Sequence, residues 1–418
     1  MSIYRLIVRS AGLLAAAVAI GALLAGAAAA QQKLSFLAAE YSAKTLPFWE
    51  QVVADFEAAN PDIDVTLEVA GWNTIHDLTA QRIAAGTMPD LVNTATIWVP
   101  EWVDAAAIRP LGDDLVDAAL RADFVPALFD KGAVYNGENW GLPIAAAARA
   151  ILLNRGLLAQ AGFDPDAPIA TWDDYRSIIV GVKEKTGAFG YAFDAKGVRA
   201  FRDFGYYLLN NGGTFFATDG KAAFNSPEGV EALQFLVDLV KAGAVPDPLG
   251  TTLEDYQPMY EAGRVATMIN GNFAIAGIKA NAPGLEIAVA AVPVKTAGQT
   301  PVTWGVTDTL VIGKAAPVEA SRKFIAHIFS TAVRNQFDEA EGMLPVLLSQ
   351  AGNPAFTGDP NIKAFIDMLP TSQFDPFHPQ YAQMQELVKT AMQSAITGAA
   401  SPKDALDKAA ADFNALVK

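Results

Sequence analysis

Hydrophobic and polar positions along the first hundred residues after position 30 follow two periods in turn, one typical of strands and one typical of helices. Residues 34–38 form a short apolar run, and residues 48–56 carry an apolar stripe at helical spacing. Alternation over 63–69 predicts a second strand, a helix is predicted over 74–85, and the apolar pair 91–92 predicts a third strand. This β-α-β-α-β order within about sixty residues predicts a parallel sheet with helices on its faces.

Signals for helix ends continue through the rest of the chain. Thr171 with Asp174 resembles a capping box, and Ser226-Pro227 and Ser401-Pro402 each offer an N-cap followed by a first-turn proline. Glycine follows two helical runs where a left-handed C-cap is expected, at Gly243 and Gly263. With no internal repeat, the pattern predicts an α/β protein with more than one lobe.

The N-terminal segment has the pattern of a secretory signal. Arg5 and Arg9 precede an apolar run over 11–30, whose last residues 28–30 are all alanine. We expect residues 1–30 to be cleaved, leaving a periplasmic protein. An uncleaved membrane anchor is the alternative, but the run consists mostly of Ala and Gly and has a weak hydrophobic drive. No cysteine follows it, so attachment through a lipoprotein cysteine is excluded.

Composition narrows the possible chemistry. The length of 418 residues predicts two or three packed units, and a hydrophobic content of 52% is typical of a globular chain. The net charge of −15 argues against a nucleic-acid partner. The absence of cysteine excludes disulfides, a thiolate metal site and a cysteine nucleophile. The three histidines lack metal-binding spacing, so we expect neither a metal nor a cofactor.

Five groups of motifs, in order along the chain, resemble the extracellular solute-binding proteins of ABC importers, the group with maltodextrin-, trehalose- and glycerol-phosphate-binding members. Each is weak alone, and their order and spacing make the resemblance specific. They are residues 49–61 (WEQVVADFEAANP), 86–91 (GTMPDL), 141–154 (GLPIAAAARAILLN) with 162–165 and 171–173, 259–271 (MYEAGRVATMING), and 304–312 with 320–329 and 342–345.

The resemblance implies a type II periplasmic-binding-protein fold, with two discontinuous α/β lobes joined by hinge strands and a ligand cleft between them. It places the N-terminal lobe at 31–143 and 283–333, and the C-terminal lobe at 144–282 and 334–418. It implies capture of a small polar solute, with a mono- or oligosaccharide favoured, and delivery to the permease subunits of an ABC transporter. It also implies a monomer that is not an enzyme.

Carbohydrates present C–H faces that stack on aromatic rings, so aromatic residues that follow strands are candidate contacts. Trp72 follows the second strand, Trp98 follows the third, and Trp304 opens a strand late in the chain. Trp98 resembles an aromatic residue of trehalose-type relatives, whereas Thr94 and Thr96 occupy a stretch where those relatives carry an acid. Packing inside a lobe remains the alternative for each tryptophan.

Polar candidates are residues whose charge or amide stands at a strand end or within an apolar run. Arg149 interrupts the apolar stretch 145–151, where a guanidinium must be paired or must face a wet cleft. The other candidates for hydroxyl binding or stacking, each with a structural alternative, are Glu40, Tyr41, Asp194, Asn272, Phe273, Asp308 and Tyr381. Because Arg149 is the single obvious cation, a neutral or singly charged solute is favoured.

Other functions stay open at this point. A periplasmic glycosidase is one, since carboxylate pairs can be chosen from 45 acidic residues, although no nucleophile-elbow, Walker or dinucleotide motif is present. A binding protein for a polyol or glycerol phosphate is another. An adhesin-like interaction protein would show neither closure nor stabilisation by a small molecule.

Overall fold

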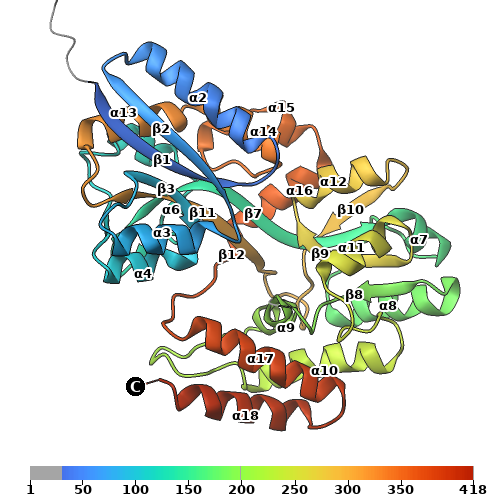
Figure 1. Ribbon diagram of the computed structural model, residues 1–418. Helices are drawn as coiled ribbons and strands as arrows, with labels where there is room; N and C mark the ends of the chain where they lie inside the picture. Colours follow the sequence, from blue (N-terminus) through green and yellow to red (C-terminus); the bar gives the residue numbers. More distant parts are fainter. Residues whose placement is uncertain (1–30, 198, 418) are drawn as a thin grey trace, which may run out of the picture.

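The chain folds into two α/β lobes that share a set of long strands (Figure 1). The computed structural model describes residues 31–197 and 199–417, so the expected signal segment 1–30 lies outside the described residues. No helix among the described residues is long and apolar enough to cross a membrane.

The predicted parallel β-α-β-α-β unit opens the first lobe. β1 (Gln32–Glu40) pairs in parallel with both β2 (Ile63–Gly71) and β3 (Leu91–Ala95). The connecting helices are α2 (Thr45–Ala59) and α3 (Ile75–Ala84). Because parallel strands end at one edge of the sheet, the residues that follow β1, β2 and β3 are brought to a common face of the lobe.

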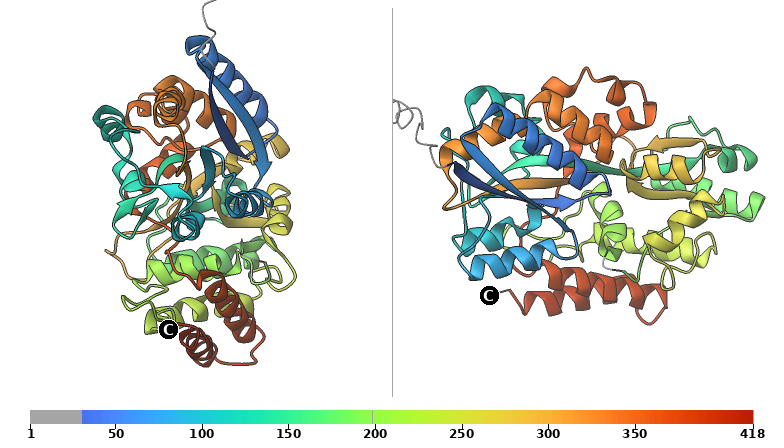
Figure 2. Two further views of the ribbon diagram at one scale, coloured as in Figure 1. Left: turned by 60° about the vertical axis from the view of Figure 1, so that its left-hand side comes forward. Right: turned by 45° about the horizontal axis from the view of Figure 1, so that its top comes forward.

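Two long strands connect the lobes (Figures 1 and 2). β7 (Gly141–Asn154) is buried at all 14 positions. Its first part pairs antiparallel with β11 (Thr303–Gly313), and its last part pairs with β9 (Val265–Gly271) and β10 (Ile287–Ala290). The strand order β2-β1-β3-β11-β7-β9-β8 therefore runs without a break from one lobe into the other.

The second lobe surrounds the far end of β7. β8 (Phe189–Ala192) pairs in parallel with β9. The helices of this lobe, which include the packed pair α17 and α18 at the bottom of Figure 1, are α7 (Arg155–Gln160), α8 (Trp172–Thr186), α9 (Ala200–Asn210), α10 (Pro227–Lys241), α11 (Leu253–Glu261), α12 (Ala274–Asn281), α17 (Tyr381–Ile396) and α18 (Pro402–Asn414). Trp172, Tyr191, Phe204 and Phe413 belong to its core.

Shorter elements complete the molecule. They are the 3-10 turns η1 (Thr96–Trp98), η2 (Leu348–Gln350) and η3 (Leu369–Thr371), the helices α4 (Val99–Asp104), α5 (Ala118–Asp123), α6 (Pro126–Phe129), α13 (Val318–Ile328), α14 (Thr331–Glu341), α15 (Pro354–Thr357) and α16 (Pro360–Met368), and the strands β4 (Ile108–Arg109), β5 (Val134–Tyr135), β6 (Glu138–Asn139) and β12 (Ser372–Gln373).

The helix ends follow the sequence signals. Thr171 and Asp174 form a capping box at the start of α8. The hydroxyls of Ser226 and Ser401 accept first-turn N–H groups of α10 and α18. Gly243 and Gly263 have φ angles of 64° and 69°, which a Cβ atom would disfavour.

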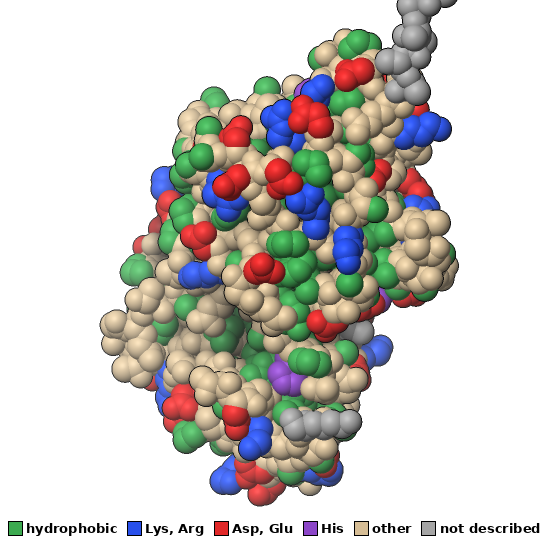
Figure 3. All heavy atoms as spheres, turned by 90° about the vertical axis from the view of Figure 1, so that its left-hand side faces the viewer, with side chains coloured by type: hydrophobic (Ala, Val, Ile, Leu, Met, Phe, Trp, Pro, Cys, Tyr) green, Lys and Arg blue, Asp and Glu red, His purple; other side chains and the backbone are tan. Residues whose placement is uncertain are grey.

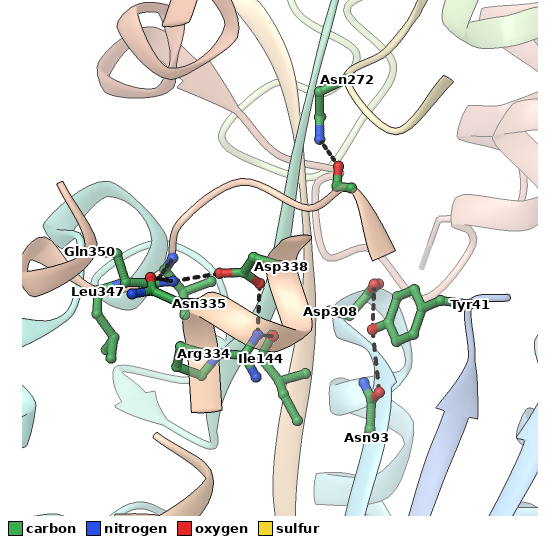
Figure 4. A network of polar contacts seen from close by, with 12 residues as sticks. Tyr41, Asn93, Ile144, Asn272, Asp308, Arg334, Asn335, Asp338, Leu347 and Gln350 are labelled. Atoms are coloured by element: carbon green, nitrogen blue, oxygen red, sulfur yellow. Dashed lines mark hydrogen bonds and ion pairs between the residues drawn. The ribbon is translucent and has the colours of Figure 1, made fainter. Parts of the chain in front are cut away.

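A buried ion pair attaches α14 to β7 (Figure 4). The Arg334 guanidinium donates to the Ile144 carbonyl at 2.5 Å and to Asp338 Oδ1 at 2.9 Å, and Gln350 donates to Asp338 Oδ2 at 2.7 Å. Both side chains of the Arg334–Asp338 pair are fully buried. Burial raises the pKa of Asp338 to about 6, against the opposing effect of Arg334.

The division of the chain into lobes at the residue level stays a prediction, and two contacts are relevant to it. β10, expected in the N-terminal lobe, pairs with residues 151–154 of β7 at the far end of that strand. Phe337 of α14, expected in the C-terminal lobe, packs 5.4 Å from Trp49 of α2, measured between ring centroids.

Candidate ligand-binding site

A cavity of about 650 Å³ lies between the lobes. A hollow between the upper and lower halves of the molecule is visible in Figure 3. This volume lies within the range that small-molecule sites occupy. Five of the residues singled out in the sequence line the cavity together: Tyr41, Trp72, Arg149, Phe273 and Asp308.

Aromatic rings from both lobes form part of the wall. Tyr41 directly follows β1 and Trp72 directly follows β2, so the parallel pairing of these strands brings the two rings together, edge to face at 5.4 Å. Phe273 contributes a ring from the start of α12, next to β9. Rings on both lobes let a solute be stacked from two sides when the lobes approach.

A polar cluster lies beside Tyr41 (Figure 4). The Tyr41 hydroxyl donates to Asp308 Oδ2 at 2.9 Å, and Asn93 Oδ1 lies 3.2 Å from the same hydroxyl. One hydroxyl proton faces two acceptors, so a protonated Asp308 would satisfy both contacts. Burial raises the pKa of Asp308 to about 7, against the lowering effects of the Tyr41 hydrogen bond and of Arg149.

Arg149 is the buried cation among the described residues that line the cavity. Its backbone N–H donates to Thr303 Oγ1 of β11, and its guanidinium lies 4.9 Å from the Phe273 ring centroid. The residue is 8% exposed, and among the described residues its guanidinium has no hydrogen-bond acceptor or ion-pair partner. Burial lowers the pKa of Arg149 to about 10, and the nearby Arg202 and Arg199 contribute to the lowering.

Two smaller cavities adjoin the same side chains. One of about 20 Å³ touches Arg149, Asp194 and Arg202, and it has room for roughly one water molecule. The other, of about 70 Å³, touches Thr96, Asp308 and Arg202. Asp194 and Thr96 therefore lie next to the main cavity, and both are already bonded within the protein: Asp194 accepts backbone N–H groups of a local turn, and Thr96 donates to the Thr307 carbonyl.

The structure places six other candidates outside the main cavity. Trp304 is 2% exposed and packs among Phe201, Tyr206 and Phe215 in the second lobe. Asn272 is 1% exposed, accepts the Ala148 N–H and donates to the Gly342 carbonyl.

The remaining four have other neighbours. Thr94 is fully buried in β3, and Glu40 is exposed at the end of β1. Trp98 packs against His76 with ring centroids 4.8 Å apart, and Tyr381 donates its hydroxyl to Asp375. Their ligand contacts stay predictions that this geometry does not support.

Several lining residues were missed in the sequence. Glu339 and Glu341 come from the C-terminal end of α14, and Arg199 precedes α9. Glu341 Oε1 accepts a hydrogen bond from Thr45, while its Oε2 is buried without a partner among the described residues. Charged residues at helix ends are ordinarily solvated, so no sequence signal distinguishes these three residues from surface charges.

Comparisons with known proteins agree with this fold. A relative from Brucella abortus (strain 2308), described as a binding protein, is 32% identical over 412 residues, which cover 98% of each chain. The crystal structure of an ABC transporter solute-binding protein from Thermotoga lettingae TMO, bound with alpha-D-tagatose, is 26% identical, has a TM-score of 0.78 and covers 93% of this chain and 100% of that one.

A third comparison extends the likeness of fold. The cyclic alpha-maltosyl-1,6-maltose binding protein from Arthrobacter globiformis is 24% identical, has a TM-score of 0.81 and covers 93% of this chain and 99% of that one. Residues 40–335 match the family model described as bacterial extracellular solute-binding protein, and these relatives are binding proteins. The chain therefore belongs to the bacterial extracellular solute-binding protein family and has its two-lobe fold.

Proposed function

We propose that the protein captures a mono- or oligosaccharide in the cavity between its lobes and delivers it to the permease of an ABC transporter. The observation that carries this proposal is the convergence of Tyr41, Trp72 and Phe273 with Asp308 and Arg149 on one interlobe cavity. Rings stack on the C–H faces of a sugar, while a carboxylate and a guanidinium bind its hydroxyls. The sugar bound by the similar Thermotoga lettingae structure supports the same ligand class.

The proposed setting is the periplasm, where the protein acts as a monomer after removal of residues 1–30. Membership of an extracellular family supports this location. Transport requires that the solute be released unchanged, so we propose that the protein has no catalytic activity. Chromatography of candidate oligosaccharides after incubation with the protein would reveal new reducing ends if it were a glycosidase.

A thermal-shift screen over neutral sugars, acidic sugars, polyols and amino acids tests the ligand class. We expect a rise in Tm with at least one saccharide, and no rise with any saccharide contradicts the proposal. Trp72→Ala should lower the affinity for that saccharide by about tenfold or more, because the substitution removes a ring on which the sugar stacks.

Trp304→Ala is the matched control. Its indole is buried in the second lobe, so this substitution should cost about 3–5 kcal/mol of unfolding free energy through the cavity it creates. We expect calorimetry on the folded fraction to show a smaller loss of affinity than Trp72→Ala causes. A larger loss of affinity in Trp304→Ala than in Trp72→Ala would show that Trp72 does not belong to the proposed site.

A further inference from the structure

Arg149 has a charge that the described part of the protein leaves unpaired. The residue is only 8% exposed, and no carboxylate of a described residue lies within 4.0 Å of its guanidinium. A buried cation without a partner is costly, and proteins ordinarily pair such a group. Since Arg149 lines the main cavity and the smaller one beside it, an acceptor brought by a ligand can reach its guanidinium.

Other positive groups surround the same place. Arg199 lines both cavities and forms no ion pair with a described residue, and Arg202 lies close enough to lower the pKa of Arg149. The first turn of α9, which begins at Ala200, borders the smaller cavity through Arg202 and Asp203. A helix N-terminus carries a partial positive charge, so it adds to the field of the arginines.

The nearby carboxylates do not cancel this field. Asp375 is paired with Arg202 at 2.8 Å, and Asp194 accepts two backbone N–H groups of its own turn. Asp203 accepts from the Asp194 N–H and the Tyr191 hydroxyl, and burial raises the pKa of its carboxyl well above the ordinary value, which disfavours the charged form. Asp308 accepts the Tyr41 hydroxyl, and its pKa is raised to about 7.

The acidic residues of the other wall are partly bonded within the protein. Glu341 accepts from Thr45 through Oε1 while its Oε2 has no partner among the described residues, and Glu339 accepts from Asn353 at 2.8 Å. Both belong to α14, which packs on α2 of the first lobe through Phe337. The cavity therefore has one side on α14, where Glu339 and Glu341 lie with Lys44, whose ammonium donates to the Ala340 carbonyl, and a cationic side formed by Arg149, Arg199 and the start of α9.

We propose that the solute is a saccharide that carries one anionic group, and that this group binds Arg149 on the cationic side of the cavity. The inference rests on the proposed function and narrows its ligand class. A carboxylate, as in a uronic acid, and a phosphate ester share the required chemistry: oxygen acceptors that a guanidinium can bind in a bidentate manner. The hydroxyls of the same ligand remain available to Asp308 and Glu341.

Calorimetry with matched sugars that differ only at C6 tests the inference. One arm uses D-glucose, D-glucuronate and glucose 6-phosphate, a second uses the three galactose counterparts, and a third uses cellobiose and cellobiouronate, a disaccharide with a single carboxylate. In at least one arm we expect an acidic sugar to bind about tenfold or more tightly than its neutral counterpart. Whichever binds more tightly, the uronate or the sugar phosphate, shows which anionic group the site recognises.

Two failures can be distinguished. If a neutral sugar binds as tightly as its acidic counterparts, the anionic ligand is refuted while the capture of saccharides stands. If no neutral or acidic saccharide raises Tm in the thermal-shift screen, the proposed function itself is refuted.

Arg149→Met removes the charge and keeps apolar volume over the Phe273 ring. We expect this variant to lose the preference for the acidic sugar, with a fall in its affinity of about tenfold or more and a smaller change for the neutral sugar. Arg176→Met is the matched control, because Arg176 is an exposed arginine on α8. Equal losses for both sugars in Arg149→Met would overturn the assignment.

A measurement without any ligand separates binding from a structural role. Because Arg149 is unpaired, Arg149→Met should leave the Tm of the ligand-free protein unchanged or higher. A fall of several degrees, as we expect for the paired Arg334, would show that Arg149 supports the fold and would overturn the proposal.

Discussion

Two buried arginines of this chain have opposite surroundings. Arg334 is fully buried and donates to Asp338 and to the Ile144 carbonyl, so its charge is compensated inside the protein. Arg149 is almost as deeply buried and has no such acceptor among the described residues. The difference is one of chemistry, since a compensated charge holds two elements together whereas an uncompensated one is available to a ligand.

Asp308 should make the stability of the ligand-free protein depend on pH. Its folded pKa of about 7 lies above the ordinary value of 3.8, so the folded state keeps a proton that the unfolded state has lost. The resulting stabilisation is complete below pH ~4 and is lost as pH rises through about 7. Asp308→Asn, which cannot ionise, should therefore be more stable than the wild type at pH 8 by roughly 1–2 kcal/mol, because cavity water screens part of the charge.

Chemical denaturation at pH 4, 6 and 8 measures this effect. Asp130→Asn is a suitable control, because Asp130 is exposed and forms no ion pair among the described residues. A wild-type and an Asp308→Asn protein with the same pH dependence would show that Asp308 is ionised in the folded state.

Part of the site could be predicted at the residue level. Tyr41 and Trp72 could be found because each directly follows a parallel strand, and Arg149 because it interrupts an apolar run. The position of Trp304 could not be predicted. Because β11 is covered on both faces, the pattern of hydrophobic residues along it does not distinguish a residue in the cavity wall from a residue in the core of a lobe. Arg199 and Glu341 were missed because they lie at helix ends, where charged residues are common on solvated surfaces.

Among the elements, the predictions were most accurate where local chemistry determines the structure. The β-α-β-α-β unit and the caps of α8, α10 and α18 follow from periodicity and capping residues. The attachment of α14 to β7 and α2 could not be predicted, because it depends on partners nearly two hundred to three hundred residues away, such as Ile144 and Trp49.

The Arg334–Asp338 pair should be essential for holding α14 in place. Arg334→Met leaves the carboxylate of Asp338 buried without its cation, and we expect a loss of about 3–5 kcal/mol of unfolding free energy. Urea denaturation monitored by fluorescence measures the loss.

The double variant Arg334→Met/Asp338→Leu provides the control. It removes both charges and should recover much of the stability that the single variant loses, because no uncompensated charge remains. A double variant as unstable as Arg334→Met would mean that packing on Phe337, and not the charge, holds the helix.

For the whole molecule, we expect the strands that the lobes share to let the lobes move relative to one another without separating. The rings of the cavity come from both lobes, so a solute can contact Trp72 on one side and Phe273 on the other. A ligand favours the closed form only through the extra contacts made there. Stacking from the second lobe would supply such contacts.

Small-angle scattering tests closure directly. We expect the radius of gyration to fall when the best saccharide is added, and the unfolding free energy to rise by about 2.7 kcal/mol at one hundred times Kd. Trp72→Ala, whose affinity we expect to be about tenfold lower, should show a smaller rise of about 1.4 kcal/mol at the same ligand concentration. An unchanged radius of gyration in the presence of a ligand that raises Tm would contradict the closing movement.

The position of Arg149 on β7 has a consequence for how cargo is held and let go. Its backbone is tied to Thr303 of β11 by two hydrogen bonds, at 3.1 and 2.6 Å, so it lies where both connecting strands meet. A group near a rotation axis travels through a short arc, whereas the outer rims travel far. We therefore expect the guanidinium to occupy nearly the same place in the empty and loaded forms, so that unloading begins at the rims and the last contact to break is the one at the axis.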